Sequence, residues 1–242
     1  MTENSKIEWT DHTFNPWVGC SKVGPACDHC YAESWAKRSA LVKWEGARRR
    51  TSVANWRGPA KWNKAAEAAQ KPATVFCLSL GDIWDKEAKP EWRFDLFQQV
   101  ESTPWLIWLF LSKRIGNSQR MCQEIGYKQL PRNVALGATM VNQPEWDRDS
   151  GKLQRAARQL GTLFTFASIE PMLMPIDIRR NTPSWVICGG ESGHGARHMQ
   201  QEWAEDLRDQ CAEQNIAFFM KQMTKKAPIP AGLLVRQLPF AA

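Results

Sequence analysis

The sequence has no long apolar run, no leader-like segment and no linker. Its longest apolar stretch, Trp105 to Leu111, is far too short to cross a bilayer. Residues 1–11 contain no apolar core of the kind found in signal peptides, so we expect a cytoplasmic protein with no membrane partner. No repeat and no stretch rich in Gly, Ser and Pro divides the 242 residues, which favours one domain over 1–242.

The chain also lacks the cysteine pattern of a disulfide scaffold. It has seven cysteines, an odd number, and no export signal accompanies them. Four of them are scattered through apolar surroundings, which predicts buried core thiols: Cys77, Cys122, Cys188 and Cys211. The other three lie within eleven residues and need another explanation.

What the sequence does have is an alternation of short apolar runs with amphipathic stretches. Apolar residues at three- and four-residue spacing predict helices through Trp92 to Val100, Leu153 to Leu160 and Trp203 to Cys211. The predicted strands are Thr13–Val18, Thr74–Leu80, Trp105–Leu111, Asn133–Thr139, Thr162–Ile169, Trp185–Cys188 and Ala217–Met220. Strands that alternate with helices pair in parallel. Six or seven such units fit a partial or full α/β barrel better than a flat doubly wound sheet.

Small or polar residues follow almost every predicted strand. In order they are Gly81-Asp82, Ser112-Lys113-Arg114, Asn142-Gln143, Glu170-Pro171, Gly189-Gly190-Glu191 and Lys221-Gln222. In parallel α/β sheets and barrels, ligands bind at the carboxyl ends of the strands. The pattern therefore predicts one convergent site built from several strand ends.

The three clustered cysteines, Cys20, Cys27 and Cys30, follow the first predicted strand and precede a predicted helix. Thiolates are soft ligands that select zinc, copper(I) or iron–sulfur clusters. A structural zinc site needs four protein ligands, and the nearby candidates for a fourth are His12 and His29. Three cysteines without an obvious fourth suit a cluster that leaves one iron open. The spacing alone leaves both metals possible.

The motifs around this loop resemble a known family. Asn15-Pro16-Trp17-Val18-Gly19-Cys20-Ser21-Lys22-Val23 and Cys27-Asp28-His29-Cys30-Tyr31-Ala32-Glu33 resemble the opening of the phage Gp37/Gp68 family. That family is catalogued as a domain of unknown function and is regarded as similar to radical S-adenosylmethionine (radical SAM) enzymes. The resemblance continues through the polar strand ends as far as Phe218-Phe219-Met220-Lys221-Gln222.

The resemblance implies a partial (β/α)6–7 TIM-like barrel of the radical SAM type. A [4Fe–4S] cluster would be held by Cys20, Cys27 and Cys30, with S-adenosylmethionine on the open iron. An external electron donor would reduce the cluster, and a 5′-deoxyadenosyl radical would abstract hydrogen from the substrate. The sequence departs from the commonest spacing of that superfamily, because six residues rather than three separate Cys20 from Cys27.

The resemblance also suggests which residues contact the cofactor and the substrate. Candidates for S-adenosylmethionine contacts are His29, Ser79, Gly81, Asp82, Lys113 and Glu170. A carboxylate such as Asp82 suits the methionine ammonium, and His29 stands where an aromatic residue usually lies beside the adenine. Candidates for substrate contacts at the strand ends are Arg114, Glu191 and Lys221. No residue of the sequence stands out as a catalytic acid or base.

The excess positive charge of the protein is concentrated in one segment. The chain carries 32 Lys and Arg against 25 Asp and Glu, a net charge of +7, and residues 31–64 hold nine of these cations against two acids. Within an insertion at about 41–64, Arg48, Arg49 and Arg50 lie among tryptophans. Cations for phosphates and rings for bases are the ingredients of nucleic-acid binding.

These patterns favour a radical SAM enzyme that acts on a nucleic-acid base or nucleotide, with phage DNA hypermodification as one setting. One alternative is a zinc-stapled nucleic-acid-binding module without catalysis. Another is a radical SAM enzyme that acts on a small metabolite or a partner protein, in which the basic segment serves a subunit contact.

Overall fold

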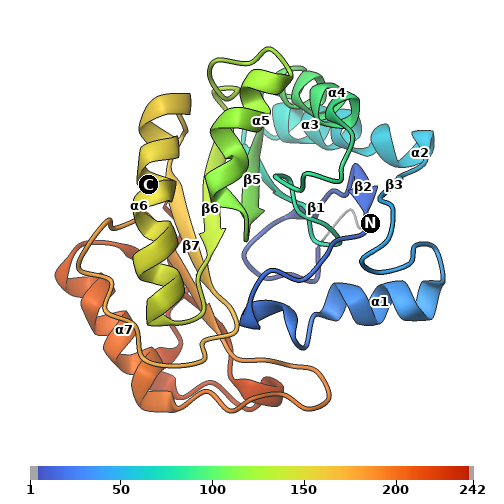
Figure 1. Ribbon diagram of the computed structural model, residues 1–242. Coiled ribbons are helices and arrows are strands. Elements are labelled where there is room, and N and C mark those ends of the chain that lie inside the picture. The colour runs from blue at the N-terminus through green and yellow to red at the C-terminus, as the bar shows by residue number, and fades with distance from the viewer. Residues whose placement is uncertain (1–4, 240–242) are drawn as a thin grey trace.

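One curled parallel sheet dominates the computed structural model, which describes residues 5–239 (Figure 1). Within these residues the sheet has seven strands in the order β1-β4-β5-β6-β7-β8-β9, and each neighbouring pair is parallel. The strands are β1 (His12–Thr13), β4 (Ala73–Cys77), β5 (Leu106–Ser112), β6 (Val134–Thr139), β7 (Thr165–Ile169), β8 (Trp185–Gly189) and β9 (Ala217–Gln222). A separate antiparallel pair joins β2 (Trp17–Val18) to β3 (Arg49–Arg50).

Helices connect most consecutive strands and cover the outer face of the sheet (Figure 1). They are α1 (Tyr31–Ser39), α2 (Val53–Trp56), α3 (Gly58–Ala68), α4 (Pro90–Glu101), α5 (Ser118–Glu124), α6 (Gln143–Leu160) and α7 (Gln201–Glu213). The three helices predicted from apolar spacing are α4, α6 and α7. No helix in residues 5–239 is long and apolar enough to span a membrane.

The larger core lies between the sheet and the helices. Trp108 and Phe110 of β5 are fully buried there, and the Phe110 ring centroid lies 5.8 Å from that of Phe97 on α4. The four scattered cysteines are buried in the same layer, which confirms their prediction as core residues: Cys77, Cys122, Cys188 and Cys211. Their thiols therefore pack as small apolar groups.

A second, smaller core fills the concave face of the sheet. Trp9 packs on Phe76 with ring centroids 4.7 Å apart and on Trp185 at 6.1 Å, while Phe166 lies 5.8 Å from Trp185. Gly137 of β6 makes room for this layer, because a Cβ there would run into the Phe166 ring. We call the layer the aromatic floor; its rings are those of Trp9, Phe76, Phe166, Trp185 and Phe219.

Beyond the floor, the concave face becomes small and polar. Alternate residues of a strand share a face, so Ser168 follows Phe166 and Lys221 follows Phe219 on the same side of the sheet. The loops after the strands meet at this edge, as when Gly190 donates its N–H to the Gln222 carbonyl at 2.9 Å. The strands therefore end along one edge of the sheet, as parallel pairing requires, and the single convergent site stays a prediction.

The strand boundaries differ from prediction most at the start of the chain. The predicted strand Thr13–Val18 is interrupted. Its two parts are β1, in the seven-stranded sheet, and β2, in the two-stranded sheet. Pro16 lies in the interruption and has no N–H to donate to a ladder. The predicted insertion at 41–64 contributes β3, which pairs with β2, and then α2 and the beginning of α3. The insertion thus packs against the first part of the seven-stranded sheet through α3, which contacts β4 and β5.

Candidate functional site

The clustered cysteines lie in one loop between β2 and α1, at the carboxyl end of the sheet (Figure 1). Gly19 opens this cysteine loop with φ of +107°, a conformation that favours glycine, and its N–H donates to the Leu80 carbonyl at 3.0 Å. Just after the loop, the Tyr31 hydroxyl donates to the Ser79 carbonyl at 2.7 Å. Both contacts tie the loop to the segment that follows β4.

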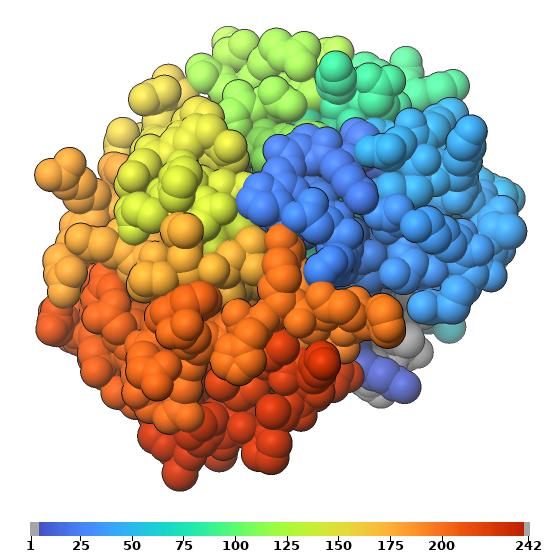
Figure 2. Space-filling view, turned by 60° about the horizontal axis from the view of Figure 1, so that its bottom comes forward, coloured from blue at the N-terminus to red at the C-terminus, as the bar shows by residue number. Residues whose placement is uncertain are grey.

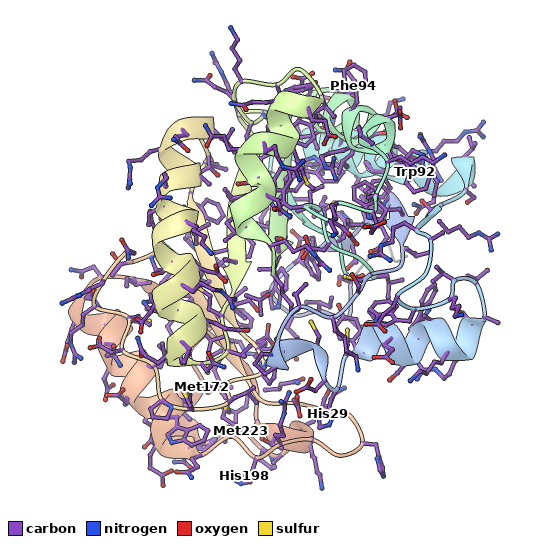
Figure 3. All side chains as sticks on the ribbon, viewed as in Figure 1. His29, Trp92, Phe94, Met172, His198 and Met223 are labelled. Atoms are coloured by element: carbon purple, nitrogen blue, oxygen red, sulfur yellow. The ribbon has the colours of Figure 1, made fainter. Side chains whose placement is uncertain are left out.

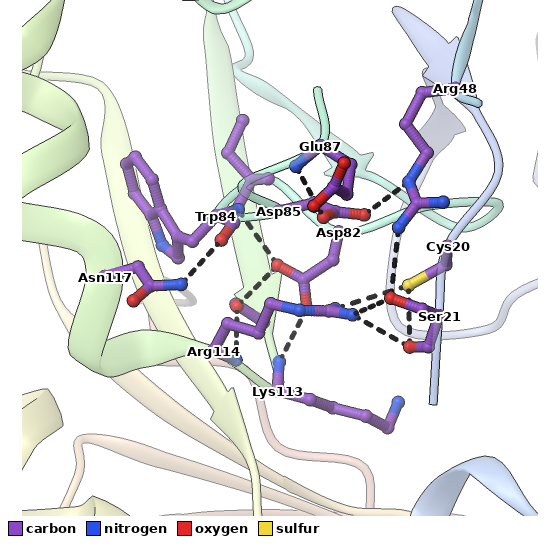
Figure 4. A network of polar contacts seen from close by, with 12 residues as sticks. Cys20, Ser21, Arg48, Asp82, Trp84, Asp85, Glu87, Lys113, Arg114 and Asn117 are labelled. Atoms are coloured by element: carbon purple, nitrogen blue, oxygen red, sulfur yellow. Dashed lines mark hydrogen bonds and ion pairs between the residues drawn. The ribbon is translucent and has the colours of Figure 1, made fainter. Parts of the chain in front are cut away.

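Arg114 fastens the beginning of the loop, Cys20 and Ser21, which we call the Cys20 end. Its guanidinium donates to Cys20 Sγ at 3.3 Å, to the Ser21 carbonyl at 2.8 Å and to Ser21 Oγ at 3.1 Å (Figure 4). Burial raises the pKa of the Cys20 thiol to about 11; the charge of Asp82 adds to this rise and Arg114 opposes it. Burial and Asp82 therefore outweigh Arg114, which is the group that opposes the rise in the Cys20 pKa.

Asp82 in turn holds Arg114 and the end of β5. One carboxylate oxygen accepts from Ser112 Oγ at 2.6 Å and from the Trp84 N–H at 2.9 Å. The other accepts from the Lys113 N–H at 2.9 Å and lies 3.2 Å from Arg114 Nη1. The S-adenosylmethionine contacts of Asp82 and Lys113 stay predictions, but the observed role of the Asp82 carboxylate is to anchor the neighbouring loop.

Arg48 also reaches the Cys20 end, from inside the protein. Its Nε lies 2.7 Å from Asp85 Oδ2, both side chains are 1% exposed, and its Nη2 donates to Ser21 Oγ at 3.0 Å (Figure 4). The sequence places Arg48 in a basic substrate-binding strip, whereas the structure buries its side chain in this ion pair, away from the exposed Arg49 and Arg50. Asp85 draws the side chain inward, because a buried carboxylate needs a charged partner.

The two following arginines stay at the surface. Arg50 pairs with Asp95 at 2.6 Å, and its guanidinium carbon lies 4.4 Å from the centroid of the Trp56 ring. Arg49 is exposed and donates to the Leu41 carbonyl at 3.0 Å. The predicted strip is thus shorter than the sequence suggests, with two exposed arginines and one aromatic platform.

Arg197 fastens the far part of the loop, Pro25 to Cys30, which we call the Cys30 end. It donates to the Pro25 carbonyl at 2.8 Å and lies 2.9 Å from Asp28 Oδ2. Figure 2 shows the orange segment of the C-terminal third lying against the blue segment that carries the loop. The loop is therefore held from both sides of the half-barrel.

Glu191 completes the Cys30 end. Its carboxylate accepts from the Arg197 guanidinium and, at 2.7 Å, from the Arg197 backbone N–H. Its other partner is Nδ1 of His29, 2.8 Å away; Figure 3 shows His29 at the lower end of the molecule. Against the effect of burial, these hydrogen bonds lower the pKa of Glu191 to about 2. His29 and Glu191, predicted separately, are thus in direct contact.

Glu170 and Lys221 meet on the concave face. Lys221 Nζ lies 2.8 Å from Glu170 Oε1, with the side chains 25% and 13% exposed. Ser168 Oγ lies 3.4 Å from the second oxygen of Glu170. Gly189 of the neighbouring strand has no side chain to displace Glu170, since a Cβ there would lie 2.9 Å from Oε1. The structure brings together two of the predicted residues beside the aromatic floor.

Ser79 and Gly81 lie where the loop meets the end of β4. Ser79 Oγ accepts from Asn15 Nδ2 at 2.9 Å, and the Asn15 amide oxygen accepts from the Leu80 N–H at 2.7 Å. Gly81 lies against the Gly19 carbonyl. Their cofactor contacts stay predictions, and their position next to Cys20 is consistent with them.

Sequence reasoning missed three residues that organise the site. Asn15 was visible only as part of a motif, and Asp85 stands just beyond the polar residues that end the second predicted strand. Arg197 lies in a polar segment without periodicity, where nothing in the sequence marks it.

The donor set of the loop fits an iron–sulfur cluster. All three thiols are free, and a cation approaches one of them. Across residues 5–239, no three His, Cys, Asp or Glu side chains are grouped as ligands of a single metal ion. Thiolate sulfur is the ligand that iron–sulfur clusters require, so the residue types of the loop fit such a cluster.

The sequence matches a defined family over residues 4–231, described as "Protein of unknown function (DUF5131)". The chain belongs to this family. That description carries no phage designation and no reaction. No curated protein sequence matches the chain.

Among solved structures, this member of the DUF5131 family is similar to spore photoproduct lyase. A variant of that enzyme aligns with a TM-score of 0.57 and 10% identity over 91% of this chain and 78% of that chain. The lyase complexed with dinucleoside spore photoproduct aligns with a TM-score of 0.55 and 11% identity, over 90% of this chain and 78% of that chain. A variant with bound AdoMet and the same dinucleoside aligns with a TM-score of 0.51 and 11% identity. The alignment covers 92% of this chain but only 58% of that chain. The likeness confirms the predicted partial barrel fold.

Proposed function

We propose that the protein is a radical S-adenosylmethionine enzyme that modifies a nucleic-acid base or nucleotide. The observation that carries this proposal is the cysteine loop, which presents three free thiols at the carboxyl end of a parallel half-barrel. Ligands of parallel α/β folds bind at that end. Spore photoproduct lyase, which shares the fold, has been solved with bound AdoMet.

Cys20, Cys27 and Cys30 would hold a [4Fe–4S] cluster and leave one iron open. When bound, the cluster supplies one electron to the sulfonium of S-adenosylmethionine, and the organic radical so formed abstracts hydrogen from the substrate. An external low-potential donor provides that electron. All seven cysteines of the chain are unpaired, which suits the reducing cytoplasm predicted from the sequence.

The residues of the concave face would orient the two organic molecules. The Lys221 ammonium, fixed by Glu170, binds an anionic group such as a carboxylate or a phosphate. His29 and Glu191 lie beside the cysteine loop, where they would meet the nucleoside part of S-adenosylmethionine or the substrate. The aromatic floor fills the part of the concave face that precedes the polar strand ends, and it excludes water from that part.

Two observations support a nucleic-acid or nucleotide substrate. Arg50 places a cation on the half-buried ring of Trp56, and the exposed Arg49 lies next to it in the chain; cations and aromatic rings of this kind bind phosphates and stack bases. Spore photoproduct lyase has been solved with a dinucleoside. Phage DNA hypermodification remains the setting that the sequence motifs suggest.

Anaerobic reconstitution with iron and sulfide tests the proposal. We expect a brown protein that, with dithionite, converts S-adenosylmethionine into 5′-deoxyadenosine and methionine. Cys20→Ala, Cys27→Ala and Cys30→Ala should each lose cluster absorbance and turnover, while Cys122→Ala, a buried thiol in α5, should keep both. One zinc per chain with no iron, or a Cys20→Ala variant equal to the wild type, would overturn the proposal and favour the zinc-stapled module.

A further inference from the structure

One of the three loop thiols has a charged neighbour that the proposed function does not use. Arg114 Nη1 lies 3.3 Å from Cys20 Sγ, at hydrogen-bond distance for a sulfur acceptor. Across residues 5–239, no corresponding hydrogen bond to the sulfur of Cys27 or Cys30 is formed. The three thiols are therefore chemically unequal before any cluster binds.

The Arg114 side chain is held in place and is not a mobile surface cation. Only 9% of it is exposed, and it also lies against Asp82 at 3.2 Å and bonds the Ser21 carbonyl at 2.8 Å. Its backbone N–H donates to Ser112 Oγ at 2.8 Å, which fixes the turn from which the side chain extends. The planar guanidinium makes several bonds at once, so each of them restrains its orientation.

A fixed cation beside a ligating sulfur changes the energy of electron uptake. When a low-potential reductant such as dithionite gives a [4Fe–4S] cluster one electron, the cluster and its thiolates gain one negative charge. Hydrogen bonds to the sulfurs and the local charge set the reduction potential of such clusters. An N–H donor that carries positive charge stabilises the reduced state more than the oxidised state.

We propose that Arg114 is a positioning residue that raises the reduction potential of the cluster through its N–H bond to the Cys20 sulfur. This rests on the proposed function, since it requires a cluster on the loop. It replaces the substrate contact predicted for Arg114 from the sequence, because the observed bonds of the guanidinium go to Cys20, Ser21 and Asp82.

The test is a dithionite titration of reconstituted protein, followed by electron paramagnetic resonance of the reduced cluster. Arg114→Gln should shift the midpoint potential to a more negative value at unchanged iron and sulfide content. Arg114→Lys keeps the positive charge but loses the planar set of N–H donors, so its shift in midpoint potential should be smaller than that of Arg114→Gln. The matched control is Arg197→Gln, which releases the Cys30 end without touching a thiol and should leave the midpoint near that of the wild type.

A midpoint in Arg114→Gln equal to that of Arg197→Gln, with full clusters in both, would overturn the proposal. If Arg114→Gln fails to hold a cluster, Arg114→Lys decides: a negative shift supports the proposal and an unchanged midpoint rejects it. Failure of the proposed function looks different, because the wild-type protein would then bind no cluster.

Discussion

The two ends of the cysteine loop are fastened by the same chemistry in different surroundings. At the Cys20 end, the Arg48–Asp85 pair is 1% exposed on both sides, and Arg114 is 9% exposed. At the Cys30 end, Arg197 is 31% exposed and its partner Asp28 is 53% exposed. Each end uses an arginine and a carboxylate, and the Cys30 end is the more solvated of the two, although the Glu191 side chain is only 7% exposed.

This difference assigns different properties to the two ends. Charges buried together are costly to separate, so the Cys20 end is rigid and belongs to the folded core. Partly solvated pairs exchange their partners for water at little cost, so the Cys30 end can open without unfolding the sheet. If the proposed cluster binds, we expect the segment around Asp28 and Cys30, on the more solvated side, to adjust more readily than the segment around Cys20.

The largest effect should follow from breaking the buried pair. Arg48→Ala leaves the Asp85 carboxylate without its partner in the interior, and we expect a loss of about 3–5 kcal/mol in the free energy of unfolding. Arg197→Ala should cost less, about 2 kcal/mol, because Arg197 and Asp28 are partly solvated and His29 and the backbone N–H of residue 197 still bond to Glu191. Urea unfolding of chelator-treated protein measures both. Equal losses would remove the distinction between the two ends.

Acid should weaken the Cys30 end through Glu191. Its folded pKa of about 2 lies below the ordinary value of 4.5, so its stabilisation is complete above that value and is lost as the pH falls toward 2. The stability difference between wild type and Glu191→Gln should therefore be constant above about pH 5 and shrink below it, from at most about 3 kcal/mol. Urea unfolding at pH 3 to 7 measures it.

The control for that pH series is the Arg197→Ala background. Arg197 supplies the strongest side-chain partner of Glu191, so the effect of Glu191→Gln should be smaller there at every pH. A pH dependence that is unchanged in this background would mean that the Glu191 charge is stabilised by something other than the clamp on the loop.

The smallest effect should come from the solvated rim of the same end. Asp28→Asn keeps the shape of the side chain and removes only its charge, 2.9 Å from Arg197. We expect a change of about 0.5 kcal/mol or less in the free energy of unfolding, further reduced in high salt. Thermal unfolding at two salt concentrations measures it. A loss comparable to that of Arg48→Ala would show that the rim belongs to the rigid core.

The fold could be predicted from the sequence because its signals are local. Runs such as Trp105 to Leu111 and the spacing of Trp92, Leu96 and Val100 each report a strand or a helix within a few residues. The convergence of the strand ends then follows from parallel pairing alone. The interrupted first strand was missed, since a two-residue bridge such as β1 leaves no periodic pattern.

Only the cysteines of the candidate site stand out in the sequence. Three cysteines in one loop are visible as spacing, but the partners that hold them come from far along the chain. Asp82 and Arg114 were each singled out, yet their pairing depends on β4 and β5 being neighbours in the sheet. Arg197 reaches across 172 residues to Pro25, and only the closure of the half-barrel brings the two together.

That last separation affects how the protein is made. During synthesis the three thiols leave the ribosome early, and the Cys20 end can be fastened once Arg114 has followed. The Cys30 end waits for Arg197, 172 residues after Pro25, and for the strands that carry it into place. In the proposed enzyme, iron and sulfide delivered before Arg197 is in place would meet a loop anchored at one end only, so cluster assembly should follow closure of the half-barrel.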